Sequence, residues 1–400
     1  MRPVTTLLFA AALSAATVLP ALAQDPPPAV KAFLDNLERQ TTIKPAFEAL
    51  TADGSGNATI TNLTLAQPAA GDTPAITVKL GEVTFSGITE QSPSLYEVAK
   101  AGFNNISVDI TGKDGTFTAS IPQAGAEGWY IRALGENPTP VEQLLATSSF
   151  ARKMNSGKIT FSASGQAVTV DGAESTWEGD PNTGAGTFNL KISNIAIPEP
   201  IVTLLDEGGM LKQLGYTSLN FDVTSLGNMT VANDKVGYSF KLGLAGRDIA
   251  SLSMDAELAD IPLAVYAAIM KAHSEGKEPD YDALMPQMQN ILLNGASFRF
   301  EDQSIVNKVL PMAAAMQGMD EKTFRASIGP MVQLALVQFQ NEAFTKQATE
   351  AITAFFTAPK SLTLTAKPAT ALKVSDFATM DPNKPGDAIS RMGLSVTAND

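Results

Sequence analysis

The chain of 400 residues contains one histidine, His273, which stands beside the sequence Ser274-Glu275-Gly276-Lys277 near the end of a predicted helix. A histidine that acts as a general base needs a nucleophile and an orienting carboxylate close by. No Gly-x-Ser-x-Gly elbow nominates a serine. The Ser-x-x-Lys spacing is that of penicillin-binding enzymes, but the companion Ser-Asp-Asn and Lys-Thr-Gly motifs are missing. Gly276 also interrupts the helical turn that aligns such a pair, so we predict no catalytic role for this segment.

Two loops carry oxygen ligands at alternate positions, as calcium loops do: Asp53-Gly54-Ser55-Gly56-Asn57 and Asp180-Pro181-Asn182-Thr183-Gly184. A calcium loop of the EF-hand type ends in a bidentate glutamate at its twelfth position. Here the twelfth residues are Thr64 and Lys191. We therefore predict that the two aspartates stabilise turns and do not bind a metal.

A third arrangement combines acidic and aromatic residues. Glu174 and Glu178 flank Trp177, and Trp129-Tyr130 follows a glycine. Paired carboxylates near an aromatic ring are typical of sugar hydrolysis, but solvated charges on an edge strand explain the pattern equally directly, and we favour that interpretation. Phosphate-binding and dinucleotide-binding glycine motifs are missing. The sequence nominates no catalytic, cofactor-binding or metal-ligating residue and implies no cofactor.

Composition narrows the function classes further. The chain has no cysteine, which excludes disulfides, thiol nucleophiles and cysteine metal sites, and one histidine cannot form a multi-histidine metal site. The formal net charge is −13, without a run of lysine or arginine to offset it. An acidic surface opposes association with nucleic acid and with anionic lipid, so no nucleic-acid partner is expected.

The first residues are typical of an export signal. Arg2 precedes an apolar segment at residues 7–19, and Ala21-Leu22-Ala23 follows as a small-x-small cleavage site. The alternative is a retained membrane anchor, but the segment has about 13 apolar residues where roughly 20 are needed to span a bilayer. We expect residues 1–23 to be a signal peptide cleaved after Ala23, a periplasmic mature protein, and no transmembrane segment after cleavage.

The pattern of apolar residues then predicts three regions. Residues 24–52 are a proline-rich leader and a helix, and residues 53–197 are rich in strands, with hairpins at 106–121 and 158–171 and a long strand at 187–197. Within the second region, Ile76, Val78 and Leu80 alternate with polar residues, whereas Val83 and Phe85 continue in the opposite phase. This change of phase at Gly81 predicts a β-bulge.

Residues 198–400 form the third region, in which helices leave strands and return to them, so that 53–400 can also be one continuous elongated domain. The returns at 297–300 and 361–364 have the form Ser-[Leu/Phe]-x-[Phe/Leu], and a helix is predicted over residues 321–356 with Ile328, Val332 and Leu336 in an apolar stripe. The predicted fold class is therefore α+β, with a long, mostly antiparallel, curved β-sheet and helical excursions packed on one face.

From about Phe188 to Ala366, including these returns, the layout resembles the YdgA-like and AsmA-like envelope proteins of Gram-negative bacteria. The resemblance implies an exported envelope protein of poorly defined function and brings no catalytic or binding motif. Those relatives usually keep an N-terminal membrane anchor, whereas the segment here has the features of a cleavable signal.

Three functions follow as hypotheses. The first is a non-enzymatic periplasmic protein whose curved sheet shelters a lipid or another apolar ligand, unless helices at residues 304–356 fill the sheet's inner face. The second is a structural or assembly factor that binds an envelope protein partner through exposed strand edges. The third is a hydrolase with an unfamiliar site. The identity of a ligand or partner and the oligomeric state are not encoded in any motif.

Overall fold

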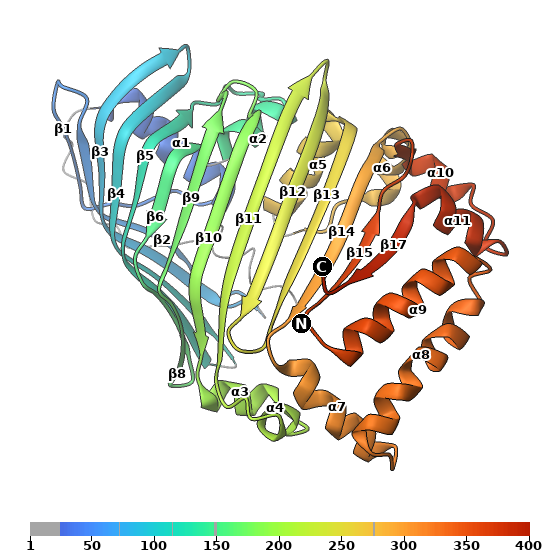
Figure 1. The fold of residues 1–400 in the computed structure, drawn as a ribbon. Helices are drawn as coiled ribbons and strands as arrows, with labels where there is room; N and C mark the ends of the chain where they lie inside the picture. Colours follow the sequence, from blue (N-terminus) through green and yellow to red (C-terminus); the bar gives the residue numbers. More distant parts are fainter. Residues whose placement is uncertain (1–24, 72, 114, 148–149, 275–276) are drawn as a thin grey trace. The chain divides into compact units, whose positions relative to one another are not determined.

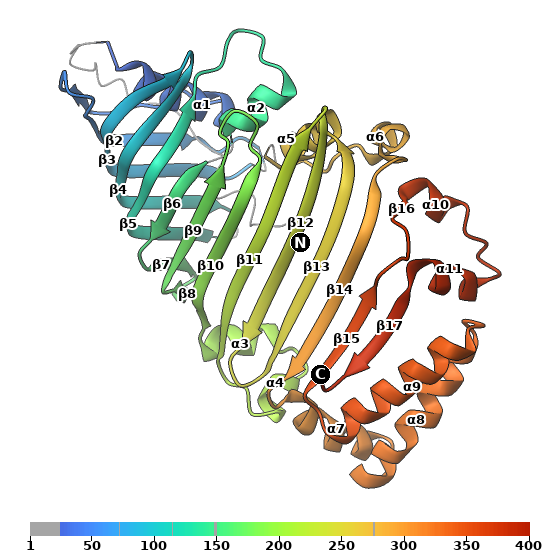
Figure 2. The ribbon, with the colours of Figure 1, turned by 45° about the horizontal axis from the view of Figure 1, so that its top comes forward.

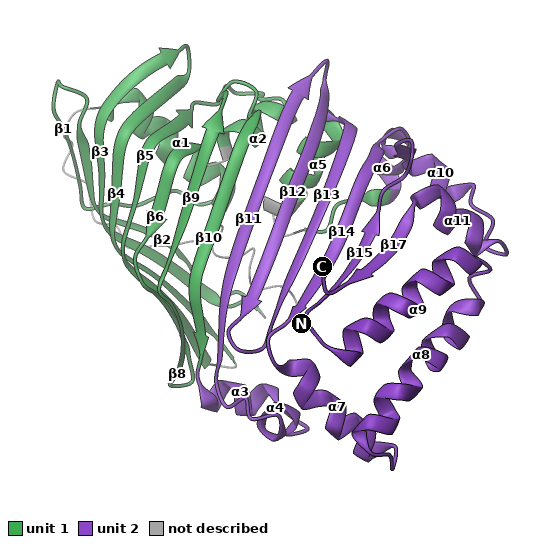
Figure 3. Cartoon of the chain, in the orientation of Figure 1, with its two compact units in different colours: residues 1–197, 263–281 green, residues 198–262, 282–400 purple. Residues whose placement is uncertain are grey.

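A computed structural model describes residues 25–400 except 72, 114, 148–149 and 275–276. In this part of the chain seventeen strands and eleven helices form an α+β fold with a large antiparallel sheet, as predicted (Figure 1). The chain divides into two compact units, which are described separately below (Figure 3). Unit 1 comprises residues 1–197 and 263–281, and unit 2 comprises residues 198–262 and 282–400. None of the described helices is both long and apolar enough to cross a membrane.

Unit 1 consists of antiparallel strands with helices α1, α2 and α5. Strands β1 to β5 pair in chain order; β5 then pairs with both β6 and β7, and these lead through β9 and β8 to β10. The elements are α1 (Pro28–Thr41), β1 (Ala49–Ala52), β2 (Ala58–Gln67), β3 (Ala75–Ser92), β4 (Leu95–Gly112), β5 (Gly115–Arg132), α2 (Pro140–Thr147), β6 (Ala151–Ser156), β7 (Ile159–Ala163), β8 (Gln166–Val170), β9 (Gly172–Gly179), β10 (Gly186–Ile197) and α5 (Leu263–Ser274).

The core of unit 1 lies between helix α1 and one face of strands β2 to β6. Apolar residues on α1 recur at helical spacing, so Val30 and Phe33 face the sheet and are buried. The Phe33 ring lies 5.4 Å from that of Phe85 and 5.6 Å from that of Trp129, both in edge-to-face arrangements. Phe85 is 1% exposed. This aromatic cluster fastens the helix to the sheet.

The predicted β-bulge at Gly81 is wrong, although the change of phase that suggested it is real. Leu80 and Val83 both pack into the core although they are three residues apart. The register of β3 with β2 and β4 does not shift at Gly81. Instead Asn62 and Asn105, the residues beside Gly81 on the neighbouring strands, have φ values of 51° and 53°. Asparagine tolerates this left-handed conformation, and on β2 Ile60 and Leu63, which are also three residues apart, both pack into the core.

Unit 2 contains six antiparallel strands in the order β11–β12–β13–β14–β15–β17, with the short β16 also paired to β14 (Figure 2). Its elements are α3 (Glu199–Leu205), α4 (Met210–Gln213), β11 (Leu219–Ala232), β12 (Lys235–Gly246), β13 (Ala250–Pro262), α6 (Tyr281–Met288), β14 (Leu292–Asp302), α7 (Ile305–Met316), α8 (Glu321–Val337), α9 (Glu342–Thr357), β15 (Ser361–Ala366), β16 (Leu372–Lys373), α10 (Val374–Ala378), α11 (Pro385–Met392) and β17 (Leu394–Ala398).

The single helix predicted over residues 321–356 is two helices. Helix α8 ends at Val337, Gln340 takes a left-handed φ of 54°, and the Asn341 side chain accepts a hydrogen bond from the backbone N–H of Phe344, which caps α9. In both views α9 lies between β17 and α8 (Figures 1 and 2). The predicted stripe holds for α8: Ile328 is buried in a cluster that joins α7, α8 and α9.

Removing the Phe85 ring tests the core of unit 1. We expect Phe85→Ala to lower the free energy of unfolding by about 3–5 kcal/mol, because a fully buried aromatic residue leaves a cavity against Phe33 and Trp129. Urea unfolding followed by tryptophan fluorescence measures this loss. Phe377→Ala, at a ring that is 39% exposed, is the matched control. A loss of less than about 1 kcal/mol in Phe85→Ala would show that the cluster is not the core.

Acid should weaken the contact that holds Asp400 to the sheet of unit 2. Hydrogen bonds from the Thr397 hydroxyl and the Arg299 guanidinium lower the pKa of Asp400 from 3.8 to about 2. A lowered pKa in the folded chain stabilises the fold above pH 4, and this contribution disappears as the pH falls through 2. Because the Asp400 side chain is 49% exposed, we expect Asp400→Asn to cost at most about 1 kcal/mol at neutral pH.

Urea titrations of wild type and Asp400→Asn at neutral pH and at pH 2 measure this difference. The two proteins should differ at neutral pH and converge at the acidic end. An equal difference at both pH values would contradict a contribution from the Asp400 carboxylate.

Candidate functional site

The strand register of unit 2 collects apolar side chains on one face of its sheet. In an antiparallel pair, directly opposed residues share a face. Three rows of opposed residues across β11 to β17 define what we call the apolar face: Val223, Leu244, Leu252, Phe300, Leu362 and Ala398; Ser225, Leu242, Met254, Phe298, Leu364 and Val396; and Gly227, Phe240, Ala256, Ala296, Ala366 and Leu394.

The four inner side chains of the middle row are open to solvent, whereas Ser225 and Val396 at its two ends are buried. Leu242, Met254, Phe298 and Leu364 are 40%, 43%, 45% and 44% exposed, respectively. Each of them has a paired strand on both sides, which shields the side chain laterally. Exposure of this extent on interior strands therefore shows that no described segment of unit 2 covers these four side chains.

Helices cover only one margin of the apolar face. Phe300, Leu362 and Ala398, at one end of the first row, pack against the cluster of α7, α8 and α9. The rings of Phe300 and Phe355 meet edge to face at 5.8 Å. If the helices at residues 304–356 filled this face, the sheet would be an ordinary core. They cover its margin and leave the inner part of the middle row open.

The opposite face of the same strands is polar and makes its own hydrogen bonds. The Ser297 hydroxyl donates to Asp255 at 2.5 Å, and the Arg299 guanidinium donates to the Thr363 hydroxyl at 2.9 Å. Arg299 also forms an ion pair with Asp400 at 2.7 Å. The sheet of unit 2 is consequently amphipathic, with one polar side and one apolar side that the described helices of the unit cover at its margin.

The apolar face offers hydrophobic contact and no acid–base chemistry. It contains no titratable side chain, and its one hydroxyl is that of Ser225. The four open side chains of the middle row cross three strand spacings of about 4.8 Å, a length of roughly 14 Å. Length and composition therefore suit an extended aliphatic chain laid across the strands.

The sheet of unit 1 has a comparable apolar row, but it is better covered. Leu65, Val78, Val108, Ala119 and Phe161 oppose one another across β2, β3, β4, β5 and β7. Three of them are buried: Leu65 at 4% exposure, Val108 at 7% and Ala119 at 4%. The chain after α1 contributes Ile43, which packs on this row. The open surface is therefore a property of the sheet in unit 2.

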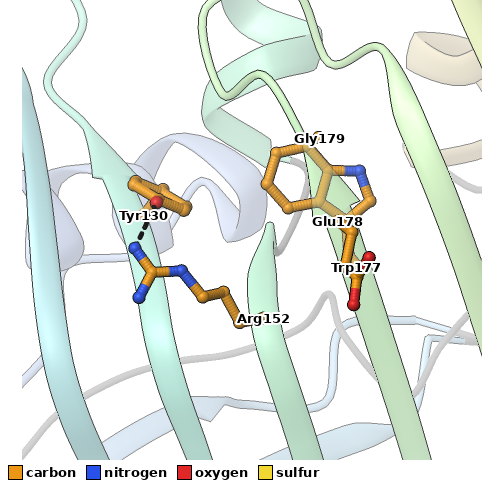
Figure 4. A pocket seen from close by; sticks show the side chains of 5 residues that line it. All are labelled: Tyr130, Arg152, Trp177, Glu178 and Gly179. Carbon is orange, nitrogen blue, oxygen red and sulfur yellow. Dashed lines mark hydrogen bonds between the residues drawn. The ribbon is translucent and has the colours of Figure 1, made fainter.

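A small hollow of about 280 Å³ lies in unit 1, where β5, β6 and β9 meet, and is lined by Tyr130, Arg152, Trp177, Glu178 and Gly179 (Figure 4). Arg152 donates to the Tyr130 hydroxyl at 3.0 Å and forms an ion pair with Glu97 at 2.8 Å. The hydrogen bond with Tyr130, together with the charge of Glu97, raises the pKa of Arg152.

The aromatic wall of this hollow is packed inside the unit. The Trp177 ring lies 6.1 Å from that of Tyr130 and 4.8 Å from that of Phe150, and Trp177 is only 8% exposed. Since the guanidinium already has two partners and stays charged at any physiological pH, it cannot exchange protons with a substrate. The contacts of Arg152 with Tyr130 and Glu97 link β6 to β5 and β4. The hollow is therefore a poorer candidate for a ligand site than the apolar face.

The sequence motif of paired carboxylates does not form a site with Trp177. Side chains alternate along β9, so the Glu174 side chain lies on the side of the strand opposite to that of Trp177, and of the two carboxylates only Glu178 borders the hollow. Glu174 is directly opposed by Lys191 on β10. The structure instead brings Trp177 next to Tyr130, the other aromatic residue that the sequence singled out.

The two aspartate loops are turns closed by the aspartates themselves. Asp53 accepts hydrogen bonds from the backbone N–H groups of Ser55 and Asn57 and from both side chains, which lowers its pKa. Asp180 accepts from Asn182 and Thr183 in the same way, and its pKa is also lowered. The predicted turn chemistry is confirmed. In the described residues no group of three acidic or histidine side chains gathers as a metal site would require.

His273 lies in the last turn of α5, as predicted. The Ser274-Glu275-Gly276-Lys277 motif includes residues 275–276, which lie outside the described part of the chain. Sequence reasoning did not single out Arg152, Leu242 or Met254. Alternation of apolar residues along β12 and β13 is a signal for the latter two, but only strand register shows that they line up.

Comparison with known proteins adds one match. A family model described as "Uncharacterized protein" matches residues 243–399. No curated protein matches the chain. The matched segment contains β13 to β17 with the helices between them, and hence most of the apolar face of unit 2.

Gly179 should be irreplaceable at the margin of the hollow. A Cβ atom there would lie 2.0 Å from the Ala185 carbonyl oxygen and 2.7 Å from the Trp177 ring. We expect Gly179→Ala to lower the free energy of unfolding by about 2 kcal/mol or more, because backbone must move to accommodate the methyl group. Gly135→Ala is the control, since nothing lies within 4 Å of its Cβ position. Equal unfolding midpoints for the two variants in urea would contradict this packing.

Proposed function

We propose that the protein is a non-enzymatic carrier or shelter for a lipid or another ligand with a long aliphatic chain, held on the apolar face of unit 2. The observation that carries this proposal is the exposure of Leu242, Met254, Phe298 and Leu364 in one row across four adjacent strands. Monomeric soluble proteins rarely leave a contiguous apolar surface of this kind uncovered, and such surfaces usually bind something.

The chemistry of the face favours an aliphatic ligand over a polar one. The one hydroxyl among the residues of the face, that of Ser225, is buried, so a polar ligand would lose hydrogen bonds with water without replacing them. Aliphatic side chains gain from any apolar contact, without a requirement for orientation. The mixture of Leu, Met and Phe side chains also adapts easily to a flexible chain.

The expected affinity is modest because the face is open on one side. Each fully buried methylene contributes about 0.8 kcal/mol. A chain with ten methylenes in contact would gain about 8 kcal/mol if it were fully enclosed and about half of that on an open face. These limits correspond to dissociation constants between roughly 1 μM and 1 mM.

Binding of the fluorescent fatty acid cis-parinaric acid tests the proposal. We expect the purified protein to enhance its fluorescence in a saturable way. Met254→Glu should weaken binding at least tenfold, because an aliphatic chain that covers a carboxylate in the middle of the row removes the water that hydrates it. Ser253→Glu is the matched control: it adds the same charge at the next residue of β13, whose side chain lies on the polar face. Met254 is 43% exposed, so the substitution should leave the fold intact.

Failure of wild type to bind, or equal weakening by Met254→Glu and Ser253→Glu, would contradict a ligand site on the apolar face. The second hypothesis, a structural or assembly factor of the envelope that works through exposed strand edges, predicts instead a stable protein partner in crosslinking pull-downs and no bound small molecule. Export to the periplasm, cleavage after Ala23 and the resemblance to YdgA-like and AsmA-like proteins stay predictions of the sequence. Residues 1–24, which contain the predicted signal, lie outside the described part of the chain.

A further inference from the structure

Helix α8 presents a second apolar surface, on the side that faces away from the cluster of α7, α8 and α9. Met331, Leu334 and Val337 follow one another at a spacing of three residues and are 53%, 78% and 60% exposed. Residues three apart on a helix lie on the same side of it. We call these three residues the outer stripe of α8.

The other side of α8 is apolar as well. Phe324 and Ile328 are buried in the cluster with Phe355 of α9. From residue 326 to residue 341 the chain has no charged side chain. A helix with apolar residues on opposite sides is normally buried, yet Leu334 and Val337 are mostly exposed, and Met331 accepts a hydrogen bond at 3.8 Å from the Ser327 hydroxyl of the same helix. The absence of charge is pronounced in a protein whose net charge is −13.

The extent and charge of the outer stripe indicate which kind of surface would cover it. Three side chains of one helix fall far short of the roughly 800 Å² per partner that a stable protein interface buries. They are enough for a helix that lies in the interfacial layer of a membrane and inserts a few apolar side chains among the lipids. The uncharged run ends at Arg325 and at Glu342. The Arg325 guanidinium is turned away from solvent, because it bonds Glu321, Asn307 and the Phe356 carbonyl within the helical cluster.

We propose that the outer stripe of α8 docks on an uncharged lipid surface, and that the protein collects or delivers its ligand there. This inference rests on the proposed function, because the same helical cluster that carries α8 packs on the margin of the apolar face through Phe300 and Leu362. A ligand that leaves the membrane beside α8 would thus meet the ligand-binding sheet of the same unit.

The net charge determines which lipids suit the protein. An acidic chain without a basic segment at the stripe is repelled by anionic headgroups. We therefore expect stronger binding to vesicles of phosphatidylcholine than to vesicles that contain phosphatidylglycerol. This order is opposite to that of basic amphipathic helices, which bind anionic lipids most strongly.

Flotation of the full-length mature protein with phosphatidylcholine vesicles tests the proposal. Wild type should float with the vesicles, and Leu334→Glu and Val337→Glu should each lower the bound fraction at least tenfold. Gln347→Glu, at an exposed position of α9, adds the same charge outside the stripe and should float like wild type. All of these positions are exposed, so the variants should fold.

Two further readouts separate this proposal from its premise. Leu334→Glu should keep its affinity for cis-parinaric acid, whereas Met254→Glu should lose that affinity and still float. Wild-type protein that does not float, or a Leu334→Glu variant that floats like wild type, would overturn the docking proposal. So would a mass of two chains in solution that falls to one chain in Leu334→Glu, since the stripe would then be covered by a second copy.

Discussion

Antiparallel strand register is the constraint on which the rest of the structure depends. Because directly opposed residues share a face, the alternation within β11 to β17 adds up to one apolar and one polar surface across the whole sheet of unit 2. A shift of one residue in any strand would move its apolar side chains to the polar side. The hydrogen bonds of Arg299 and Ser297 on the polar face help to keep that register.

The two units use the same amphipathic design to different ends. In unit 1, α1 and the segment that contains Ile43 cover the apolar side, and an aromatic cluster around Phe85 makes it a conventional core. In unit 2 the helices pack at the margin, against Phe300 and Leu362, and leave the neighbouring row exposed. Unit 2 is the candidate ligand site because its apolar face is less covered than that of unit 1, and this argument does not depend on any catalytic arrangement of residues.

The sequence predicted those features that local patterns determine. The hairpin between β4 and β5 and the hairpin between β7 and β8 follow from alternation interrupted by turn residues, and the α+β class follows from the change between periods of two and of 3.6 residues. It did not predict the break at Gln340, because the apolar stripe of Ile328 and Val332 continues in phase across it. Nor did it predict the open row, because exposure depends on which strands align and on where distant helices pack.

Chemical labelling of the apolar face tests whether this surface of unit 2 is open and binds a ligand. The chain has no cysteine, so Leu364→Cys provides a unique label in the open row, and Val236→Cys, at a fully buried position, provides the reference. If the apolar face is open and binds a ligand, a thiol reagent modifies Leu364→Cys far faster than Val236→Cys, and saturating fatty acid slows the reaction at Leu364→Cys alone. Equally slow reactions at both positions, or a rate at Leu364→Cys that fatty acid does not change, would contradict an open ligand site on this face.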